Sequence, residues 1–171
     1  MRLTIPATAL EPSTPLAPNP AGLTREFFPK LSGDSLLDLT TMPDFYRPPA
    51  VTEVITASSF GGFGQNYGVR LRGYLTAPAS GDYVFWECGS GDVSVNLATD
   101  DTSTALHQSI RLNDRPNRKE LAHHKGATEP GEWDKHRTQQ SKPITLIAGK
   151  RYYLEVLFKT GEGPDLSLIH I

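Results

Sequence analysis

The sequence has one cysteine, little net charge and no long apolar run, and each of these absences excludes a class of protein. A single cysteine, Cys88, rules out an internal disulfide, a cysteine-rich secreted miniprotein and a cysteine-based zinc finger. The net charge of −2 argues against a nucleic-acid binder held by a broad positive field. Because no apolar run approaches the roughly 18 residues that a membrane helix needs, no membrane span is expected.

Helix signals are scarce, whereas turn formers are abundant: 15 glycines and 14 prolines among 171 residues. Residues 35–40 predict a single helical turn. Prolines crowd the start of the chain, so residues 1–21 are predicted to be a Pro-rich linker or a disordered N-terminus. Residues 22–171 are long enough to bury a core as one domain. The sequence leaves open whether residues 166–171 belong to that domain or mark a truncated end.

Alternation of apolar and polar residues, separated by turn chemistry, predicts a series of strands. The segment 151–159 carries apolar residues on both faces, which is typical of a central strand. The predicted strands are residues 67–75, 81–88, 92–99, 106–112, 143–147 and 151–159. Such a series without helices between the strands predicts an all-β fold, an antiparallel β-sandwich.

The longest gap between predicted strands runs from Leu112 to Ile144, and a stretch of that length inside a domain is often functional. Trp133 lies in it, within Gly131-Glu132-Trp133-Asp134-Lys135. An aromatic ring on a polar loop can stack on a sugar while neighbouring carboxylates bind hydroxyls. A lid that folds over the edge of the sandwich explains the same pattern equally well.

Three other motifs favour structural interpretations. Gly33-Asp34-Ser35-Leu36 spells an esterase tetrapeptide, but no α/β alternation surrounds it, so a polar turn is favoured. Gly61-Gly62-Phe63-Gly64 is followed by neither Gly-Lys-Ser/Thr nor a helix pattern, which favours a surface connection over a phosphate loop. Asp92, Asp100 and Asp101 flank one predicted strand; they suit calcium by ligand type and equally suit turns.

Taken together, the order and spacing of several short stretches resemble the protective-antigen N-terminal domain family, the PA-fourteen domain. The resemblance spans about residues 22–165. The stretches that carry it are Gly22-Leu-Thr-Arg-Glu-Phe-Phe28, Asn66-Tyr-Gly-Val-Arg-Leu-Arg-Gly-Tyr-Leu75, Pro78-Ala-Ser-Gly-Asp-Tyr-Val-Phe-Trp86, Leu97-Ala-Thr-Asp-Asp101, Glu132-Trp-Asp-Lys135, Gln139-Gln-Ser-Lys-Pro-Ile144 and Ala148-Gly-Lys-Arg-Tyr-Tyr-Leu-Glu155. The variant is similar to those in large multidomain surface proteins of environmental bacteria.

The resemblance implies a β-sandwich that binds a glycan or polysaccharide without catalysis, as part of a larger exported protein at the cell surface. Neighbouring domains of the same chain are further implied partners. In calcium-dependent members, two consecutive aspartates hold the ion that binds the sugar. Aligned without gaps, that pair falls on Ser90 and Gly91, and Asp92 is the one carboxylate nearby. Fewer charged ligands mean weaker affinity, so at most a weak calcium site is implied.

The site hypothesis places carbohydrate at an edge formed by residues 89–92 and 113–135. Its members are Asp92 as ligand to calcium or to a hydroxyl, Trp133 as stacking platform, and Asp134 and Asn96 as hydrogen-bonding groups. Asn113 and Asp114 are further candidates in the second loop. The alternative function is a structural spacer with no ligand of its own.

Overall fold

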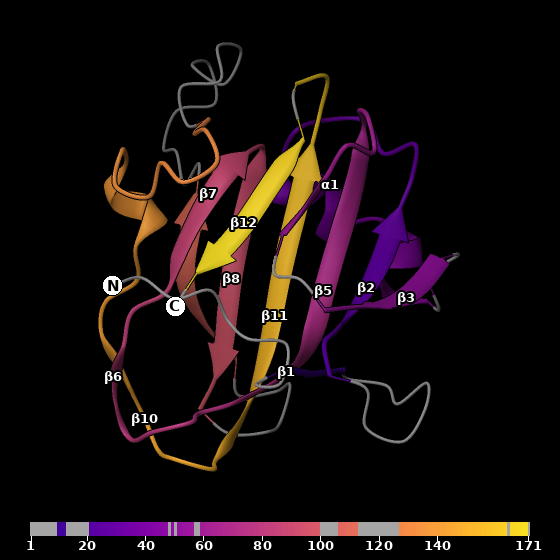
Figure 1. Cartoon of the computed structure of the whole chain (residues 1–171). Coiled ribbons are helices and arrows are strands. Elements are labelled where there is room, and N and C mark those ends of the chain that lie inside the picture. The colour runs from indigo at the N-terminus through magenta and orange to yellow at the C-terminus, as the bar shows by residue number, and fades with distance from the viewer. Residues whose placement is uncertain are drawn as a thin grey trace.

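The computed structural model shows a sandwich of antiparallel sheets with a thin helical layer on one outer face (Figure 1). The structure describes residues 10–12, 21–47, 49, 51–56, 59–99, 106–112, 127–163 and 165–170. In chain order the elements are β1 (Leu10–Pro12), β2 (Leu23–Phe28), α1 (Leu36–Thr40), η2 (Pro43–Tyr46), β3 (Val51–Ile55), β4 (Ser59–Gly61), β5 (Tyr67–Thr76), β6 (Gly81–Tyr83), β7 (Trp86–Ser90), β8 (Asp92–Ala98), β9 (Leu106–Leu112), η5 (Arg137–Gln139), β10 (Ile144–Leu146), β11 (Arg151–Thr160) and β12 (Leu166–His170). The predicted all-β antiparallel sandwich is confirmed.

One layer, the large sheet, has the strand order β3-β2-β5-β11-β8-β9, and β1 also pairs with β5. The predicted central position of residues 151–159 is confirmed, because β11 pairs with β5 on one side and with β8 on the other. Within the predicted N-terminal linker, Leu10–Pro12 pairs with β5 despite its proline. Among the described strands β1 pairs with β5 alone, so Pro12 lies on an edge strand, where a missing N–H is tolerated.

The opposite layer contains the small sheet, β4-β12-β7, and the strand pair β10-β6. Residues Leu166–His170 form the middle strand of the small sheet, so these five residues are part of the fold. The predicted single strand 81–88 is instead two strands. β6 pairs with β10 as far as Tyr83, and β7 pairs with β12 from Trp86 onward. Between them, the Phe85 N–H donates to the Ser141 hydroxyl and the Ser141 N–H donates to the Phe85 oxygen.

The core lies between the two layers. Side chains that alternate inward from β5, β8 and β11 meet Phe85 and Ile169 from the opposite layer. The largest contributors are Tyr67, Leu71, Val95, Leu154, Val156 and Phe158. Within the described part of the chain, no helix is long and apolar enough to span a membrane.

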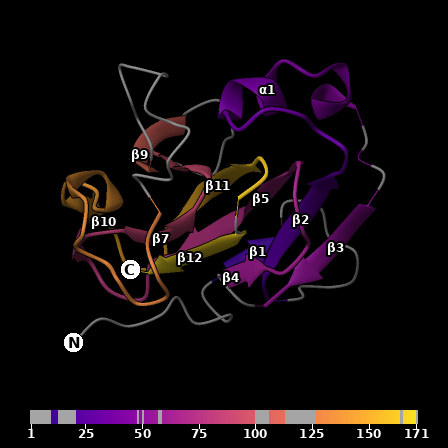
Figure 2. The same cartoon turned by 90° about the horizontal axis from the view of Figure 1, so that it is seen from above.

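The helical layer covers the other face of the large sheet (Figure 2). Ser35 caps α1, because its hydroxyl accepts the N–H of Leu37 and its own N–H is bound by Asp38. This confirms the predicted turn at 35–40 and places Ser35 as a helix cap. Gly68 allows the helical layer to pack closely on β5, since a Cβ there would lie 2.6 Å from a methyl carbon of Leu39.

Candidate functional site

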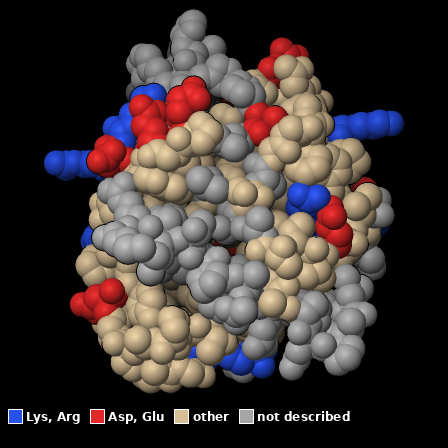
Figure 3. Space-filling model, viewed as in Figure 1, with Lys and Arg blue, Asp and Glu red and all other residues tan. Residues whose placement is uncertain are grey.

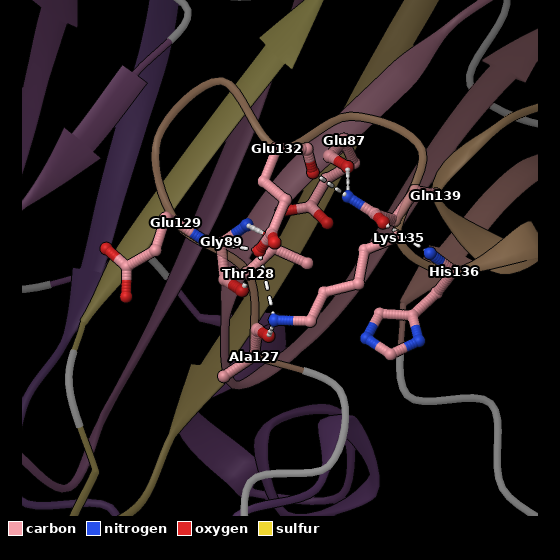
Figure 4. Close-up of polar contacts among 9 residues, drawn as sticks. All are labelled: Glu87, Gly89, Ala127, Thr128, Glu129, Glu132, Lys135, His136 and Gln139. Atoms are coloured by element: carbon pink, nitrogen blue, oxygen red, sulfur yellow. Dashed lines mark hydrogen bonds and ion pairs between the residues drawn. The ribbon is translucent and has the colours of Figure 1, made fainter.

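Residues 127–141, here called the strap, run along the edge of β7 that faces away from β12 (Figure 4). Thr128 binds Gly89 twice: the Thr128 N–H donates to the Gly89 oxygen at 2.8 Å, and the Gly89 N–H donates to Thr128 Oγ1 at 2.7 Å. Further along, Gln140 forms an antiparallel bridge with Trp86. Covering a strand edge in this way prevents pairing with other chains.

Gln139 is the buried centre of the strap. Its amide nitrogen donates to the backbone oxygens of Glu87, at 3.0 Å, and Glu132, at 2.7 Å. Its amide oxygen accepts the N–H of His136 at 2.7 Å. One side chain therefore fixes the strap both to β7 and to its own turn, as Figure 4 shows.

The turn at residues 129–135 is held by Glu132. Its carboxylate accepts the N–H of Glu129 at 3.1 Å and the ammonium of Lys135 at 3.0 Å. The Glu129 N–H, followed by Lys135, lowers the pKa of the Glu132 carboxyl, so Glu132 stays ionised and paired with Lys135. Lys135 also donates to the Ala127 oxygen and closes the loop. Acidic and basic side chains gather in this region at the upper left of Figure 3.

Two of the predicted site residues, Trp133 and Asp134, lie on this turn. Trp133 is half-buried, with its N–H bound to the oxygen of Gly131, and Asp134 is exposed. Gly131 has φ +87°, a backbone conformation that glycine adopts without strain. The strap therefore presents an indole and a carboxylate side by side in sequence on a backbone fixed at several points.

The other two predicted residues, Asp92 and Asn96, lie on β8, on the face of the large sheet turned toward α1. Asp92 is 6 % exposed, and its carboxylate accepts the N–H of Leu36 at 2.9 Å. Asn96 is half-buried opposite Glu155 and accepts the hydroxyl of Ser94 at 3.2 Å. The predicted residues thus belong to two places: Trp133 and Asp134 to the strap, Asp92 and Asn96 to β8.

The described residues do not fit a calcium site. Calcium takes six to eight oxygen ligands, whereas one oxygen of the nearly buried Asp92 carboxylate is bound to Leu36. Across the described ranges, no group of three or more His, Cys, Asp or Glu side chains is placed to hold a metal. The other candidate ligands, Asp100, Asp101, Asn113 and Asp114, lie outside the described residues.

Sequence analysis did not single out Glu87, a titratable residue that is fully buried on β7. Register pairs it with Ile169, a core residue, so its side chain points between the layers. Burial raises the pKa of Glu87 well above its ordinary value, and a contact with the Ser167 hydroxyl opposes that shift only in part. Its neighbour Cys88 is also fully buried. The sequence signal for a buried carboxyl was an acidic residue inside a strand, residues 81–88, whose two faces are otherwise largely apolar.

Comparison with known proteins finds partial relatives and a shared fold. No family model matches the chain. It is 34 % identical over 107 residues to mouse N-acetyl-beta-glucosaminyl-glycoprotein 4-beta-N-acetylgalactosaminyltransferase 1, a match over 59 % of this chain and 9 % of that protein. The fold resembles part of the beta-glucosidase from Kluyveromyces marxianus in complex with glucose, with TM-score 0.60 and 17 % identity over 98 % of this chain and 18 % of that one.

A second solved structure is similar over most of both chains. It is the Epithelial Adhesin 6 A domain from Candida glabrata in complex with Galb1-3GlcNAc, with TM-score 0.50 and 12 % identity over 98 % of this chain and 83 % of that one. At such identities the likeness shows the all-β fold alone. The chain spans about a tenth of the mouse transferase and under a fifth of the glucosidase.

Proposed function

We propose that this chain is a non-catalytic carbohydrate-binding or adhesion module of a larger exported protein, from the protective-antigen N-terminal domain family. The observation that carries the proposal is the strap, which presents Trp133 and Asp134 on a rigid, negatively charged turn. The three similar proteins described above have names or ligands that concern sugars: a glycosyltransferase, a glucosidase bound to glucose and an adhesin domain bound to a disaccharide.

The proposed mechanism is binding by contact, with no bond made or broken. A pyranose ring packs its C–H face on the indole of Trp133, which supplies a large apolar area at small entropic cost. The Asp134 carboxylate, exposed beside it, accepts hydrogen bonds from sugar hydroxyls. Because Gln139 and Glu132 already fix the turn, little further ordering is needed when a sugar binds.

The relation to larger proteins supports a role as one module among several. The similar segment makes up 9 % of the mouse transferase and 18 % of the glucosidase chain. The proposal includes a location at the cell surface, which the likeness to an adhesin domain supports. Calcium stays a prediction from the family resemblance, and its further candidate ligands lie outside the described residues.

A structural spacer is the second candidate function, and one observation favours it. Asp92, the carboxylate expected to serve a ligand, is nearly buried and bonded to the backbone of Leu36. A module whose acidic side chains serve the fold can separate neighbouring domains without binding anything.

A glycan array with Trp133→Ala tests the proposal against the spacer. The parent chain is expected to bind at least one class of glycan, and Trp133→Ala to lose most of that signal. Tyr46→Ala is the matched control, because Tyr46 is an aromatic residue 78 % exposed on the helical layer, away from the strap. Equal signals from the parent and Trp133→Ala would contradict the proposed site, and no signal from either would favour the spacer.

A further inference from the structure

Residues 61–65 form a second exposed loop that is rigidly anchored. One carboxylate oxygen of Asp165 accepts the N–H of Phe63 at 2.5 Å, the N–H of Gly64 at 3.0 Å and the hydroxyl of Tyr67 at 2.9 Å. Two successive backbone donors on one carboxylate hold the loop backbone in a single conformation. The sequence predicted only a surface connection here, so the anchoring is an observation beyond that prediction.

This fixed loop exposes an aromatic ring. Phe63 is 42 % exposed although it packs against Phe27, at 5.6 Å between ring centroids, and Tyr67, at 5.8 Å. The guanidinium of Arg25 lies 4.6 Å from the centre of the Phe63 ring. A Cβ added at Gly62 or Gly64 would meet no atom within 4 Å, so open space lies on both sides of Phe63 along the loop.

Polar groups border the ring on the neighbouring strands. Arg25 is paired with Glu53 of β3, through Nε at 2.9 Å, and that pair carries no net charge. Residues 51–53 are all exposed, so β3 is uncovered on both of its faces there. Val51, opposite Phe27 in the register, adds an exposed apolar side chain next to this pair.

The loop and the Thr128 end of the strap lie at the same end of the small sheet. Leu166 of β12 pairs with Gly61 on one side and Ser90 on the other, so β4 and β7 end level with each other. Two inter-strand spacings, about 10 Å, separate β4 from β7, and the strap lies one spacing further, along the outer edge of β7. Gly61 leads directly into the Phe63 loop, and Gly89, next to Ser90, is bonded to the strap.

We propose that Phe63, with Arg25 and Glu53 beside it, is a second carbohydrate contact that binds a further unit of an oligosaccharide held at Trp133. This proposal rests on the proposed function. An exposed ring beside a neutral guanidinium–carboxylate pair matches an uncharged, hydroxyl-rich ligand. Two exposed apolar side chains, Phe63 and Val51, fall far short of the roughly 800 Å² per partner that a specific protein interface buries, so a sugar fits better than a protein.

The test is a printed array of defined monosaccharides to hexasaccharides, probed with the parent, Phe63→Ala and Phe63→Tyr. Phe63→Ala is expected to weaken binding to trisaccharides and longer glycans by about tenfold, while monosaccharide signals stay within about twofold. Phe63→Tyr retains the ring and is expected to bind like the parent. Leu37→Ala, an exposed apolar residue on the helical layer, is the matched control.

The outcomes separate the two proposals. Parent-like binding by Phe63→Ala at every length, together with loss in Trp133→Ala, overturns the second contact and leaves the proposed function standing; the patch would then be a contact for another domain. Equal loss in Phe63→Ala and Phe63→Tyr with unchanged thermal unfolding also overturns it, because the ring would not be what binds. No parent signal on any glycan overturns both proposals.

Discussion

The Asp92 carboxylate accepts the backbone N–H of Leu36 at 2.9 Å and so joins the start of β8 to the first turn of α1. The two residues are 56 positions apart in the chain, and Asp92 is nearly buried where they meet. The first N–H groups of a helix have no partner within the helix, and a carboxylate there satisfies one of them. The residue that sequence analysis placed in a binding site therefore holds the helical layer on the sheet.

Replacing Asp92 is expected to destabilise the fold. Asp92→Ala leaves a buried N–H without its acceptor and should cost about 1–3 kcal/mol in the free energy of unfolding. Urea denaturation followed by fluorescence measures this, with the exposed Asp134→Ala as control, expected within about 0.5 kcal/mol of the parent. Equal stability of Asp92→Ala and the parent would show that the Leu36 contact contributes nothing measurable.

Gln139 should control the order of the strap. Gln139→Ala removes three hydrogen bonds around a buried position and should cost about 1–3 kcal/mol. Hydrogen exchange should rise across residues 128–140 and stay unchanged in β11. Gln140→Ala is the matched control, because Gln140 is the next residue in the chain and its own side chain is exposed. Uniformly faster exchange throughout the chain would mean global destabilisation and would contradict a local role.

Glu87 should make stability depend on pH in a defined direction. Burial raises its folded-state pKa above the ordinary 4.5, so the folded state binds the proton more tightly than the unfolded state. Its contribution is present at pH values below 4.5 and is lost as pH rises toward the raised pKa. Glu87→Gln, which stays uncharged, should become more stable relative to the parent as pH rises above 4.5, until the raised folded-state pKa is passed.

Chemical denaturation of both proteins at a series of pH values from acid to mildly alkaline measures this difference. A parent-to-variant difference that stays constant across the series would contradict a neutral, buried Glu87. Glu129→Gln serves as control, because Glu129 is exposed on the strap turn and should leave the profile unchanged.

The last strand should be essential to the domain. Ile169 is 1 % exposed and belongs to the core, so Ile169→Ala should cost about 2–5 kcal/mol. Ile147, 56 % exposed, offers a matched control at which the same substitution should cost little. Thermal unfolding compares the two. Equal effects at both positions would contradict the placement of β12 between β4 and β7.

The sheet was predictable from the sequence where strands alternate over seven or more residues. β5, β8 and β11 match their predictions closely, because their inward side chains form the core. β3 and β4 were missed, since they are short and partly exposed and leave little periodicity. The pairing of β12 depends on contacts with β4 and β7 that lie far away in sequence.

The candidate site was predictable only in part, for a similar reason. A tryptophan in a polar loop pointed to the strap, and the structure places Trp133 and Asp134 there. The position of Asp92 depends on α1 packing against β8, a tertiary contact that no local pattern encodes. Likewise, the anchoring of Phe63 by Asp165 joins segments about a hundred residues apart, at a sequence separation of 102.

The central claim is that this module binds carbohydrate by direct side-chain contacts. The most direct measurement is a glycan array of the parent chain, run once with calcium and once with a chelator. Binding to a defined class of glycan that persists in chelator is the predicted result. Binding lost in chelator would contradict direct contact and show that binding requires a metal ion. No binding in either condition would contradict the claim itself and leave the spacer function.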